Sequence, residues 1–223
     1  MTDGEAGPDP DGRTGERAMQ VNGAPGALVV IISGPSGVGK DTIIAAMQER
    51  APGRTDRHHV ITCTTRGRRD YEVDGVHYLF HSQEEFMRLR ETDGLLEYAE
   101  VHGNWYGTPR DQVVEALTAG RDAILKIDVQ GARAVRALIP DALLIFVVPP
   151  SVDELNARLV ARSTETPEAL AQRMRNAESE LARQRDYDHV VINETDRVER
   201  TAAAIDAIIT AEHARYPDRR LRA

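Results

Sequence analysis

One glycine-rich stretch constrains the fold of this chain more than any other. It reads Gly34-Pro35-Ser36-Gly37-Val38-Gly39-Lys40 and lies between the apolar run 27–32 and an amphipathic segment. This order predicts a strand, a tight loop and a helix. In such a loop the backbone N–H groups point at an anion, the helix adds its positive end, and the lysine adds a mobile charge. We therefore expect a binding site for the phosphates of a nucleoside triphosphate, formed by Gly34, Pro35, Ser36, Gly37, Val38, Gly39, Lys40, Asp41 and Thr42.

The residue after the loop lysine departs from the common motif. Loops of this kind have Ser or Thr there, whose hydroxyl binds Mg²⁺, whereas this chain has Asp41 followed by Thr42. An acidic residue, Asp128, ends a later apolar run, at the place where nucleotide kinases hold a second carboxylate near the metal. We therefore expect Mg²⁺ to bind together with the nucleoside triphosphate, with oxygen ligands drawn from Asp41, Thr42 and Asp128.

Composition limits the class of protein. The chain has 223 residues, which suit one α/β domain with insertions or two small domains, and its single cysteine excludes an internal disulfide. The net charge of −8 argues against a surface for DNA or RNA. No apolar stretch has the roughly 20 residues of a membrane span, and no signal peptide is recognisable. We expect a soluble, cytoplasmic protein, a monomer or homodimer, that binds neither nucleic acid nor membrane.

The rest of the chain alternates predicted strands and helices. Residues 1–26 are polar and rich in Gly and Pro, so we expect them to be disordered. Ser82 with Glu85 and Ser151 with Glu154 are predicted capping boxes. Strands are predicted at 27–33, 59–65, 76–80, 95–102, 123–128, 143–148 and 189–193, and helices at 41–50, 82–91, 108–120, 131–138, 151–162, 166–185 and 198–213. This alternation predicts a parallel, doubly wound α/β sheet with ligands at the carboxyl ends of its strands.

Between Gly34 and Asn193 the sequence resembles the guanylate kinases. The resemblance rests on several uncommon strings in one order: Thr64-Thr65-Arg66, Arg69, Glu72-Val73-Asp74-Gly75, Tyr78, Glu97-Tyr98-Ala99-Glu100-Val101-His102-Gly103-Asn104, Tyr106-Gly107-Thr108-Pro109-Arg110 and Ile127-Asp128-Val129-Gln130-Gly131-Ala132. It implies an enzyme of purine nucleotide metabolism that transfers the γ-phosphoryl of ATP to GMP, and to dGMP. It also implies the P-loop nucleoside monophosphate kinase fold, with a core at 27–60, 110–154 and 186–215, a GMP-binding insertion at 61–109, a helical lid at 155–185 and a short tail at 216–223.

The resemblance further implies which residues bind GMP. Glu97 matches the family's reader of guanine, whose adjacent N1–H and N2–H₂ donors suit the two oxygens of a carboxylate, whereas adenine would present an acceptor there. Arginine forks fit a phosphate bidentately, and phenol hydroxyls donate from its flank. Thr108 is expected both to contact the base and to start a helix together with Pro109. The residues matched to GMP are Thr62, Arg66, Arg69, Tyr78, Glu97, Tyr106, Thr108 and Asp128.

Arginines in the lid match the family's positions for phosphoryl transfer. The transferred group spreads negative charge over its oxygens and needs no covalent help from the protein, so arginines brought in by lid closure stabilise it. The resemblance therefore implies that Arg162 and Arg173 are catalytic together with Lys40, and that Arg158 binds ATP. Trp105 stands where the family usually has Tyr, and we expect it to pack.

A second departure from the family lies beside Asp128. Lys126 replaces the acid usually found two positions earlier, just as Asp41 replaces Ser or Thr after the loop lysine. Because the loop and the strand that ends at Asp128 lie side by side in this fold, we expect Asp41 and Lys126 to pair, directly or through a metal-bound water. Two independent changes are the alternative interpretation.

Other functions can be weighed on the same residues. A ribose bisphosphate phosphokinase of phosphonate metabolism shares the sequence Gly-Lys-Asp, but its substrate has no base for Glu97 to read. Non-catalytic guanylate-kinase-like binding modules lose the phosphate loop, which is intact here. A regulatory nucleotide switch needs no acceptor site. His77 and His81 flank a predicted strand, so a histidine metal site is not favoured, and nothing indicates a nucleophilic Cys63.

Overall fold

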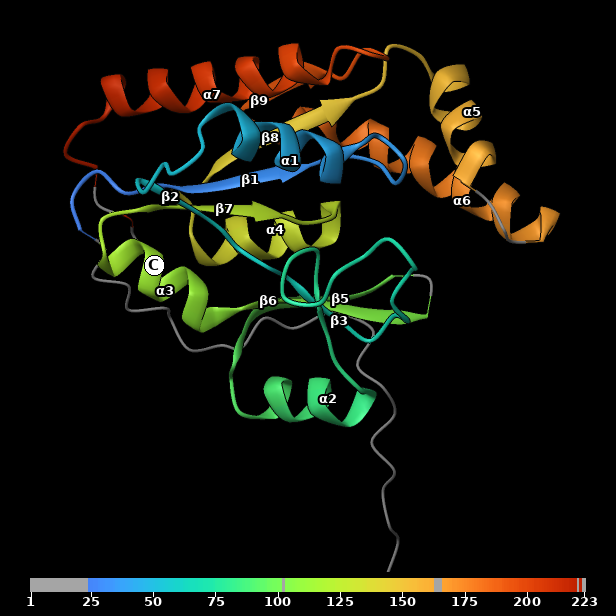
Figure 1. Cartoon of the computed structure of the whole chain (residues 1–223), viewed down its shortest axis with the longest axis horizontal. Coiled ribbons are helices and arrows are strands. Elements are labelled where there is room, and N and C mark those ends of the chain that lie inside the picture. The colour runs from blue at the N-terminus through green and yellow to red at the C-terminus, as the bar shows by residue number, and fades with distance from the viewer. Residues whose placement is uncertain (1–23, 102, 163–165, 220, 222–223) are drawn as a thin grey trace, which may run out of the picture.

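The computed structural model describes residues 24–101, 103–162, 166–219 and 221, which form two sheets surrounded by helices (Figure 1). Residues 1–23, most of the predicted disordered tail, lie outside the described residues. The last residues of that predicted tail belong to the fold, because the N–H of Ala24 donates to the carbonyl of Leu117 and the N–H of Gly26 donates to the carbonyl of Arg219. The described fold therefore includes residues 24–26, which the sequence assigns to the tail.

The larger sheet consists of parallel strands in the order β2-β7-β1-β8-β9. β1 lies at its centre, with Ile31 beside Leu125 of β7 on one side and Leu144 of β8 on the other. All of β1 is buried and β8 is continuously apolar, as expected where helices cover both faces. The strands are β1 (Val29–Ser33), β2 (Arg57–His59), β7 (Asp122–Lys126), β8 (Leu143–Val148) and β9 (His189–Ile192). The predicted parallel, doubly wound sheet is confirmed.

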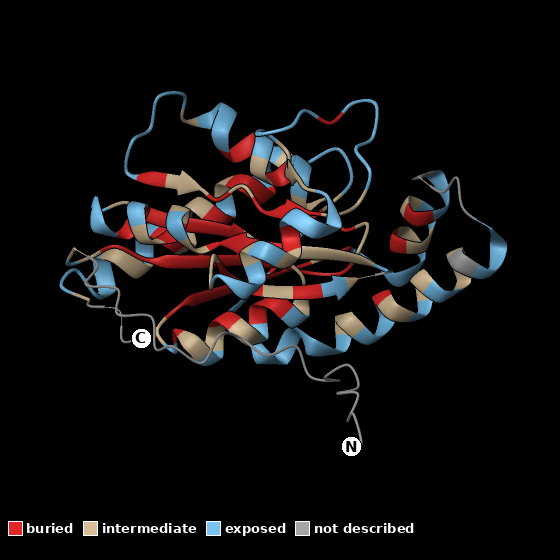
Figure 2. Cartoon of the chain, turned by 90° about the horizontal axis from the view of Figure 1, so that it is seen from below, coloured by how far each residue is buried: buried red, intermediate tan, exposed pale blue. Residues whose placement is uncertain are grey.

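Helices cover both faces of this sheet (Figure 1). One face packs against α3 (Arg110–Thr118) and α4 (Val129–Leu138), and the other against α1 (Lys40–Arg50) and α7 (Val198–Arg215). The helices α5 (Val152–Arg162) and α6 (Pro167–Leu181) join the second group through Leu155, Leu159 and Ala177. Figure 2 shows the buried residues concentrated along the central strands, while α5 and α6 extend beyond them with mostly exposed outer ends. No helix in the described ranges is both long and apolar enough to cross a membrane.

A smaller sheet, with strand order β4-β3-β6-β5, lies beside the larger one (Figure 1). β5 and β6 pair antiparallel, with an irregularity in register between Leu95 and Glu97. Cys63, Phe86 and Leu95 form its small core together with α2 (Gln83–Glu91). The strands are β3 (Cys63–Thr64), β4 (Leu79–Phe80), β5 (Leu95–Val101) and β6 (Asn104–Pro109).

Several predicted elements are right in type but differ in extent. The predicted strand 59–65 is divided, because its first residue ends β2 in the larger sheet and Cys63–Thr64 form β3 in the smaller one. The predicted strand 76–80 is reduced to β4. The helix predicted to reach Arg185 ends at Leu181 and continues as a 3₁₀ turn, η1 (Ala182–Asp186). The side-chain pattern locates these elements, but their ends depend on which sheet each segment joins.

The helix starts agree with prediction in part. The capping box of Ser82 and Glu85 forms as predicted. At the start of α5, Oγ of Ser151 accepts the N–H of Glu154 at 3.1 Å, but the Glu154 carboxylate turns to Arg158. The sequence pattern therefore predicts a capping box correctly where, as for Glu85, no arginine competes for the carboxylate of the third helical residue.

The predicted start of α3 is wrong. Thr108 lies in β6, where its hydroxyl donates to Glu97, and Pro109 is the residue before the helix. The sequence does not predict a strand at 104–109, because Gly107 and Pro109 are typical of strand ends and breaks. The Thr108 hydroxyl therefore serves the site and not the helix.

Candidate active site

The loop between β1 and α1 folds as the glycine pattern predicts. Gly39 has φ of 99°, a left-handed conformation, and precedes α1 as its N-cap. A Cβ there would lie 2.7 Å from Nδ2 of Asn193, so only glycine fits. The ammonium of Lys40 donates to the carbonyl oxygens of Gly34 (2.6 Å) and Pro35 (3.2 Å). Burial lowers the pKa of this ammonium, and nearby carboxylates oppose the shift. Lys40 is thus held against the loop, next to the place where the nucleotide phosphates are predicted to bind.

Two side chains of α6 reach the loop at Ser36. A guanidinium N–H of Arg173 donates to Oγ of Ser36 at 3.2 Å, and the N–H of Ser36 donates to Oε2 of Glu180 at 3.0 Å. The structure therefore brings Arg173 to the loop. Sequence reasoning missed Glu180, although it lies two helical turns after Arg173 and so on the same face of the helix.

Arg158 of α5 joins the loop to the end of β9. Its guanidinium donates to the carbonyl oxygens of Val38 (3.3 Å) and Asn193 (3.0 Å), and Nδ2 of Asn193 also donates to Val38 (2.8 Å). Sequence reasoning missed Asn193, whose only signal is its place at a strand end.

A cavity of about 260 Å³ lies beside the loop. It is lined by Gly37, Gly39, Thr42, Arg158, Asn193, Glu194, Thr195, Asp196 and Val198. A larger cavity of about 350 Å³ lies between the end of α1 and β2, and none of the predicted site residues lines it. Position beside the loop, and not size, therefore selects the smaller cavity for the site.

Arg162 is the last residue of α5, and its side chain lies outside the described residues. Its role in phosphoryl transfer stays a prediction.

Asp41 and Lys126 pair directly, as predicted, with Nζ of Lys126 donating to Oδ1 of Asp41. The pairing follows from the sheet, because Lys126 lies beside Ile32 where β7 runs parallel to β1. The ammonium also lies 4.4 Å from the centre of the Tyr78 ring. This pair therefore connects the phosphate loop to the region of the smaller sheet.

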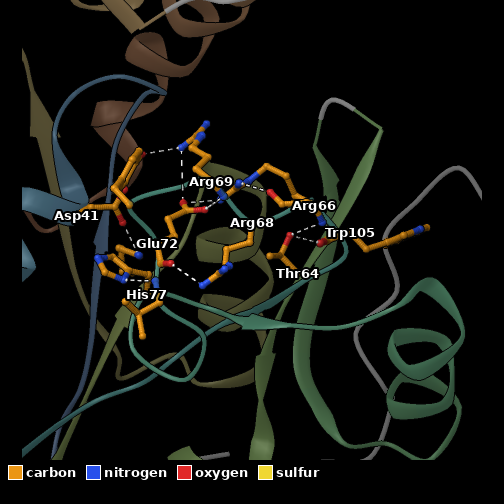
Figure 3. A network of polar contacts seen from close by, with 12 residues as sticks. Asp41, Thr64, Arg66, Arg68, Arg69, Glu72, His77 and Trp105 are labelled. Carbon is orange, nitrogen blue, oxygen red and sulfur yellow. Dashed lines mark hydrogen bonds and ion pairs between the residues drawn. The ribbon is translucent and has the colours of Figure 1, made fainter.

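Glu72 organises the predicted phosphate-binding arginines (Figure 3). Its buried carboxylate accepts from the guanidinium of Arg66 (2.6 Å) and from the backbone N–H of Arg69 (2.8 Å). Desolvation opposes ionisation, but these hydrogen bonds hold the pKa of Glu72 below its ordinary value. The Arg66 guanidinium lies 5.5 Å from the centre of the Tyr78 ring, which meets the Tyr106 ring at 6.1 Å. The structure thus brings all four predicted phosphate-binding residues together, with both arginines held by one acid that sequence reasoning left without a role.

Glu97 lies where β5 meets the start of α4. Its buried carboxylate accepts from the Thr108 hydroxyl at 2.6 Å, and a Cβ at Gly131 would lie only 2.7 Å from its other oxygen. Burial raises the pKa of Glu97 to about 8, since Asp128 adds to the shift and the Thr108 hydrogen bond only partly offsets it. Thr62, just before β3, is buried as well. A carboxyl group with so few partners is suited to receive a ligand's donors.

The residues predicted to bind Mg²⁺ are already partly engaged. One oxygen of Asp41 pairs with Lys126, and one oxygen of Asp128 accepts the N–H of Gly131 at 2.8 Å as the N-cap of α4. Thr42 is exposed and lines the smaller cavity. Mg²⁺ bound with a nucleotide takes most of its oxygens from phosphates and water, and needs one or two from the protein. Mg²⁺ prefers carboxylate and hydroxyl oxygens as ligands, so the chemistry of these three side chains fits an ion brought by ATP.

The other residues singled out from the sequence make packing and hydrogen-bond contacts that explain them without a role in binding or catalysis. Trp105 packs its ring against Phe86 at 6.0 Å, so its predicted packing role is confirmed. Burial raises the pKa of the Cys63 thiol to about 12, which makes it a poor nucleophile. Nδ1 of His77 accepts the N–H of Val73 at 3.0 Å. In the described part of the chain, no group of three or more His, Cys, Asp or Glu side chains is arranged to hold a metal.

Comparisons with known proteins identify one family. A family model described as guanylate kinase matches residues 27–212. A guanylate kinase of Symbiobacterium thermophilum is 47% identical over 191 residues, covering 86% of this chain and 88% of the relative. One from Halalkalibacterium halodurans is 45% identical over 186 residues, covering 83% and 89%. The crystal structure of guanylate kinase from Anaplasma phagocytophilum is similar with a TM-score of 0.70 at 29% identity, covering 85% of this chain and 87% of that one.

Proposed function

The chain belongs to the guanylate kinase family and is an ATP:GMP phosphotransferase, and we propose that its two sheets divide the two substrates between them. The loop after β1 binds the phosphates of ATP, and the smaller sheet binds GMP. The observation that carries this proposal is a chain of contacts from Asp41 through Lys126 and Tyr78 to Arg66. These contacts support a short path between the two phosphate sites, which phosphoryl transfer requires.

The ATP site is proposed on both sides of the loop. Backbone N–H groups and the start of α1 face the phosphates, and Lys40 exchanges its carbonyl partners for a phosphate oxygen. The cavity of about 260 Å³ beside the loop takes the nucleoside half, where Arg158, Asn193 and Asp196 offer polar groups. Its position directly beside two loop glycines supports this assignment.

The GMP site is proposed around Glu97 and around Glu72 with its partners Arg66 and Arg69. Glu97 accepts the N1–H and N2–H₂ of guanine, and the Thr108 hydroxyl keeps it oriented. A base without these donors would leave the buried carboxyl unpaired, so the site should reject adenine and pyrimidines. Arg66, Arg69, Tyr78 and Tyr106 hold the phosphate, with Thr62 and Asp128 completing the pocket.

Transfer itself is proposed to depend on positioning and charge. An oxygen of the GMP phosphate attacks the γ-phosphorus of ATP, and the bond from that phosphorus to the ADP oxygen breaks. Lys40 and Arg173, with Arg162, stabilise the charge on the transferred group as the lid closes and excludes water. The contact of Arg173 with Ser36 supports its reach to this point.

The same proposal includes a magnesium ion and the cellular location of the enzyme. Mg²⁺ would be held by Asp41, Thr42 and Asp128 together with ATP, and it supplies charge neutralisation on the phosphates. We place the enzyme in the cytoplasm, bound to small molecules and not to nucleic acid, as the acidic net charge of −8 favours. We also propose the division into core, insertion at 61–109 and lid at 155–185, which the smaller sheet and the helices α5 and α6 support.

A coupled assay of ATP-dependent ADP formation tests this function. GMP, AMP, UMP and ribose 1,5-bisphosphate are offered as acceptors in parallel. We expect turnover with GMP, and a kcat/KM at least 10²-fold lower with the others, because only guanine satisfies Glu97. Preference for ribose 1,5-bisphosphate would replace the acceptor assignment, and ATP binding without any turnover would indicate a binding module.

A further inference from the structure

Glu180 occupies a backbone donor of the phosphate loop. The N–H of Ser36 donates to its Oε2 at 3.0 Å, across 144 positions of the chain. The N–H groups of such a loop are the donors that receive phosphate oxygens. A carboxylate oxygen and a phosphate oxygen are both anionic acceptors that require the same donor and repel each other. Glu180 and a phosphate at this N–H therefore exclude one another.

The helix presents Glu180 from a face that is anchored in the core. Arg173, Ala177 and Glu180 are spaced by three or four positions and so share one side of α6. Ala177 is buried in the same apolar cluster to which Leu181 packs. Arg173 on this face donates to the hydroxyl of Ser36, the residue whose N–H Glu180 accepts. The helix α6 thus contacts both the side chain and the backbone of Ser36.

The contact between Glu180 and Ser36 involves a charged acceptor, so it opposes a ligand that needs the same N–H. A hydrogen bond to a carboxylate is roughly twice as strong as one between neutral groups. Any ligand that binds only after this contact opens loses apparent affinity in proportion to the contact's stability. Breaking the contact also separates Glu180 from the loop. Because Arg173 lies on the same face of α6, it moves together with Glu180.

We propose that Glu180 is a positioning residue that holds α6 on the phosphate loop until a phosphate of ATP displaces it. Phosphate binding then releases Arg173 from Ser36 toward the transferred phosphoryl. The contact weakens the binding of ATP and of the product ADP, and does not affect GMP. This inference rests on the proposed assignment of the loop to the ATP phosphates.

Calorimetric titration of the Glu180→Gln variant tests the inference. Glutamine keeps an acceptor oxygen but loses the charge, so we expect the Kd for ATP, ADP and inorganic tripolyphosphate to fall by about fivefold to tenfold. The Kd for GMP should stay within about twofold. Glu178→Gln is the matched control, because it removes the same charge from an exposed position of the same helix. Unchanged or weaker ATP binding in Glu180→Gln overturns the inference.

Steady-state kinetics and a loop variant separate the possible failures. In Glu180→Gln the KM for ATP should fall without a rise in kcat, which a loss of fold would not produce. Lys40→Met should lose most of its ATP affinity, and if it binds ATP like the unmodified enzyme, the loop assignment itself is wrong. If Lys40→Met loses ATP while Glu180→Gln binds it unchanged, only the role of Glu180 is wrong. For Glu180→Ala, which also removes packing, ATP should raise the Tm by more than it does in the unmodified enzyme.

Discussion

The proposed GMP site and the proposed ATP site, called here the GMP side and the ATP side, are assembled by different means. On the GMP side, Arg66 lies 6 positions from Glu72, and Thr108 lies 11 positions from Glu97. On the ATP side, the α6 partners of Ser36 lie 137 and 144 positions away along the chain. The first set of contacts forms within one small sheet and its loops, whereas the second set depends on where a distant helix packs.

This difference suggests a division of labour between the two sides. Contacts within one compact unit hold the proposed guanine reader, Glu97, and the proposed phosphate-binding arginines in place before substrate arrives, which favours selectivity. Contacts between the loop and a separate helix can open when a ligand replaces one partner, which favours movement. We therefore expect variants on the GMP side to change which substrate is used, and variants on the ATP side to change nucleotide affinity or the rate of transfer.

The largest expected effect is on the ATP side. Arg173→Lys keeps the charge but loses the planar fork, so we expect kcat to fall by a factor on the order of 10² to 10³, with a smaller change in nucleotide Kd. Arg162→Lys is predicted to behave alike. Arg175→Lys, at an exposed position of α6, is the control and should keep its activity. Losses of equal size in kcat and in ATP affinity would make Arg173 a binding residue and weaken the comparison.

A slightly smaller effect is expected for Glu97→Gln on the GMP side. One acceptor oxygen becomes a donor, which should lower kcat/KM for GMP by roughly 10²-fold and leave the Kd for ATP nearly unchanged. Glu100→Gln, an exposed site on the same strand, is the control. Normal GMP turnover by Glu97→Gln would exclude Glu97 as the reader of guanine.

The burial of Glu97 on the GMP side should also make the free energy of unfolding depend on pH. The pKa of Glu97 rises from its ordinary value of 4.5 to about 8 in the fold, so the folded state binds this proton more tightly than the unfolded chain. Its contribution to stability is present below about pH 4.5 and is lost as the pH rises toward 8, by at most about 1.4 kcal/mol per pH unit. Denaturant unfolding between pH 5.5 and 7.5 measures this. Glu97→Gln should gain stability relative to the unmodified enzyme as pH rises, and parallel curves would contradict the prediction.

The smallest effect concerns the joint between the two sides. Asp41→Ser leaves Lys126 without its carboxylate partner and should lower activity, and adding Lys126→Glu should recover much of it. Because the Asp41 side chain is 52% exposed, we expect a coupling free energy of only about 1 kcal/mol from the double-mutant cycle. A coupling below roughly 0.5 kcal/mol, the range of independent sites, would mean that two unrelated changes happen to lie in contact.

Much of the site can be predicted from the sequence, because it depends on short motifs or on the order of strands in a parallel sheet. The loop follows from its glycines and flanks, and the Asp41–Lys126 pair follows from two adjacent strands of a parallel sheet. Thr108 was misassigned as a helix cap because the same hydroxyl suits a cap and a carboxylate, and only the pairing of β6 with β5 places it opposite Glu97. Glu72 carried no sequence signal that separates a buried acid from an exposed one.

The sequence by itself determined the phosphate loop, the alternation of strands and helices, and the family strings that imply ATP and GMP. These follow from backbone preferences and side-chain periodicity, which act between near neighbours. Only the tertiary structure decided that Glu180 and Arg173 share Ser36, that Arg158 joins the loop to Asn193, and that Glu72 gathers the arginines. Such partners are chosen by how apolar helix faces pack over the sheets, since that packing sets which polar groups come within hydrogen-bond distance.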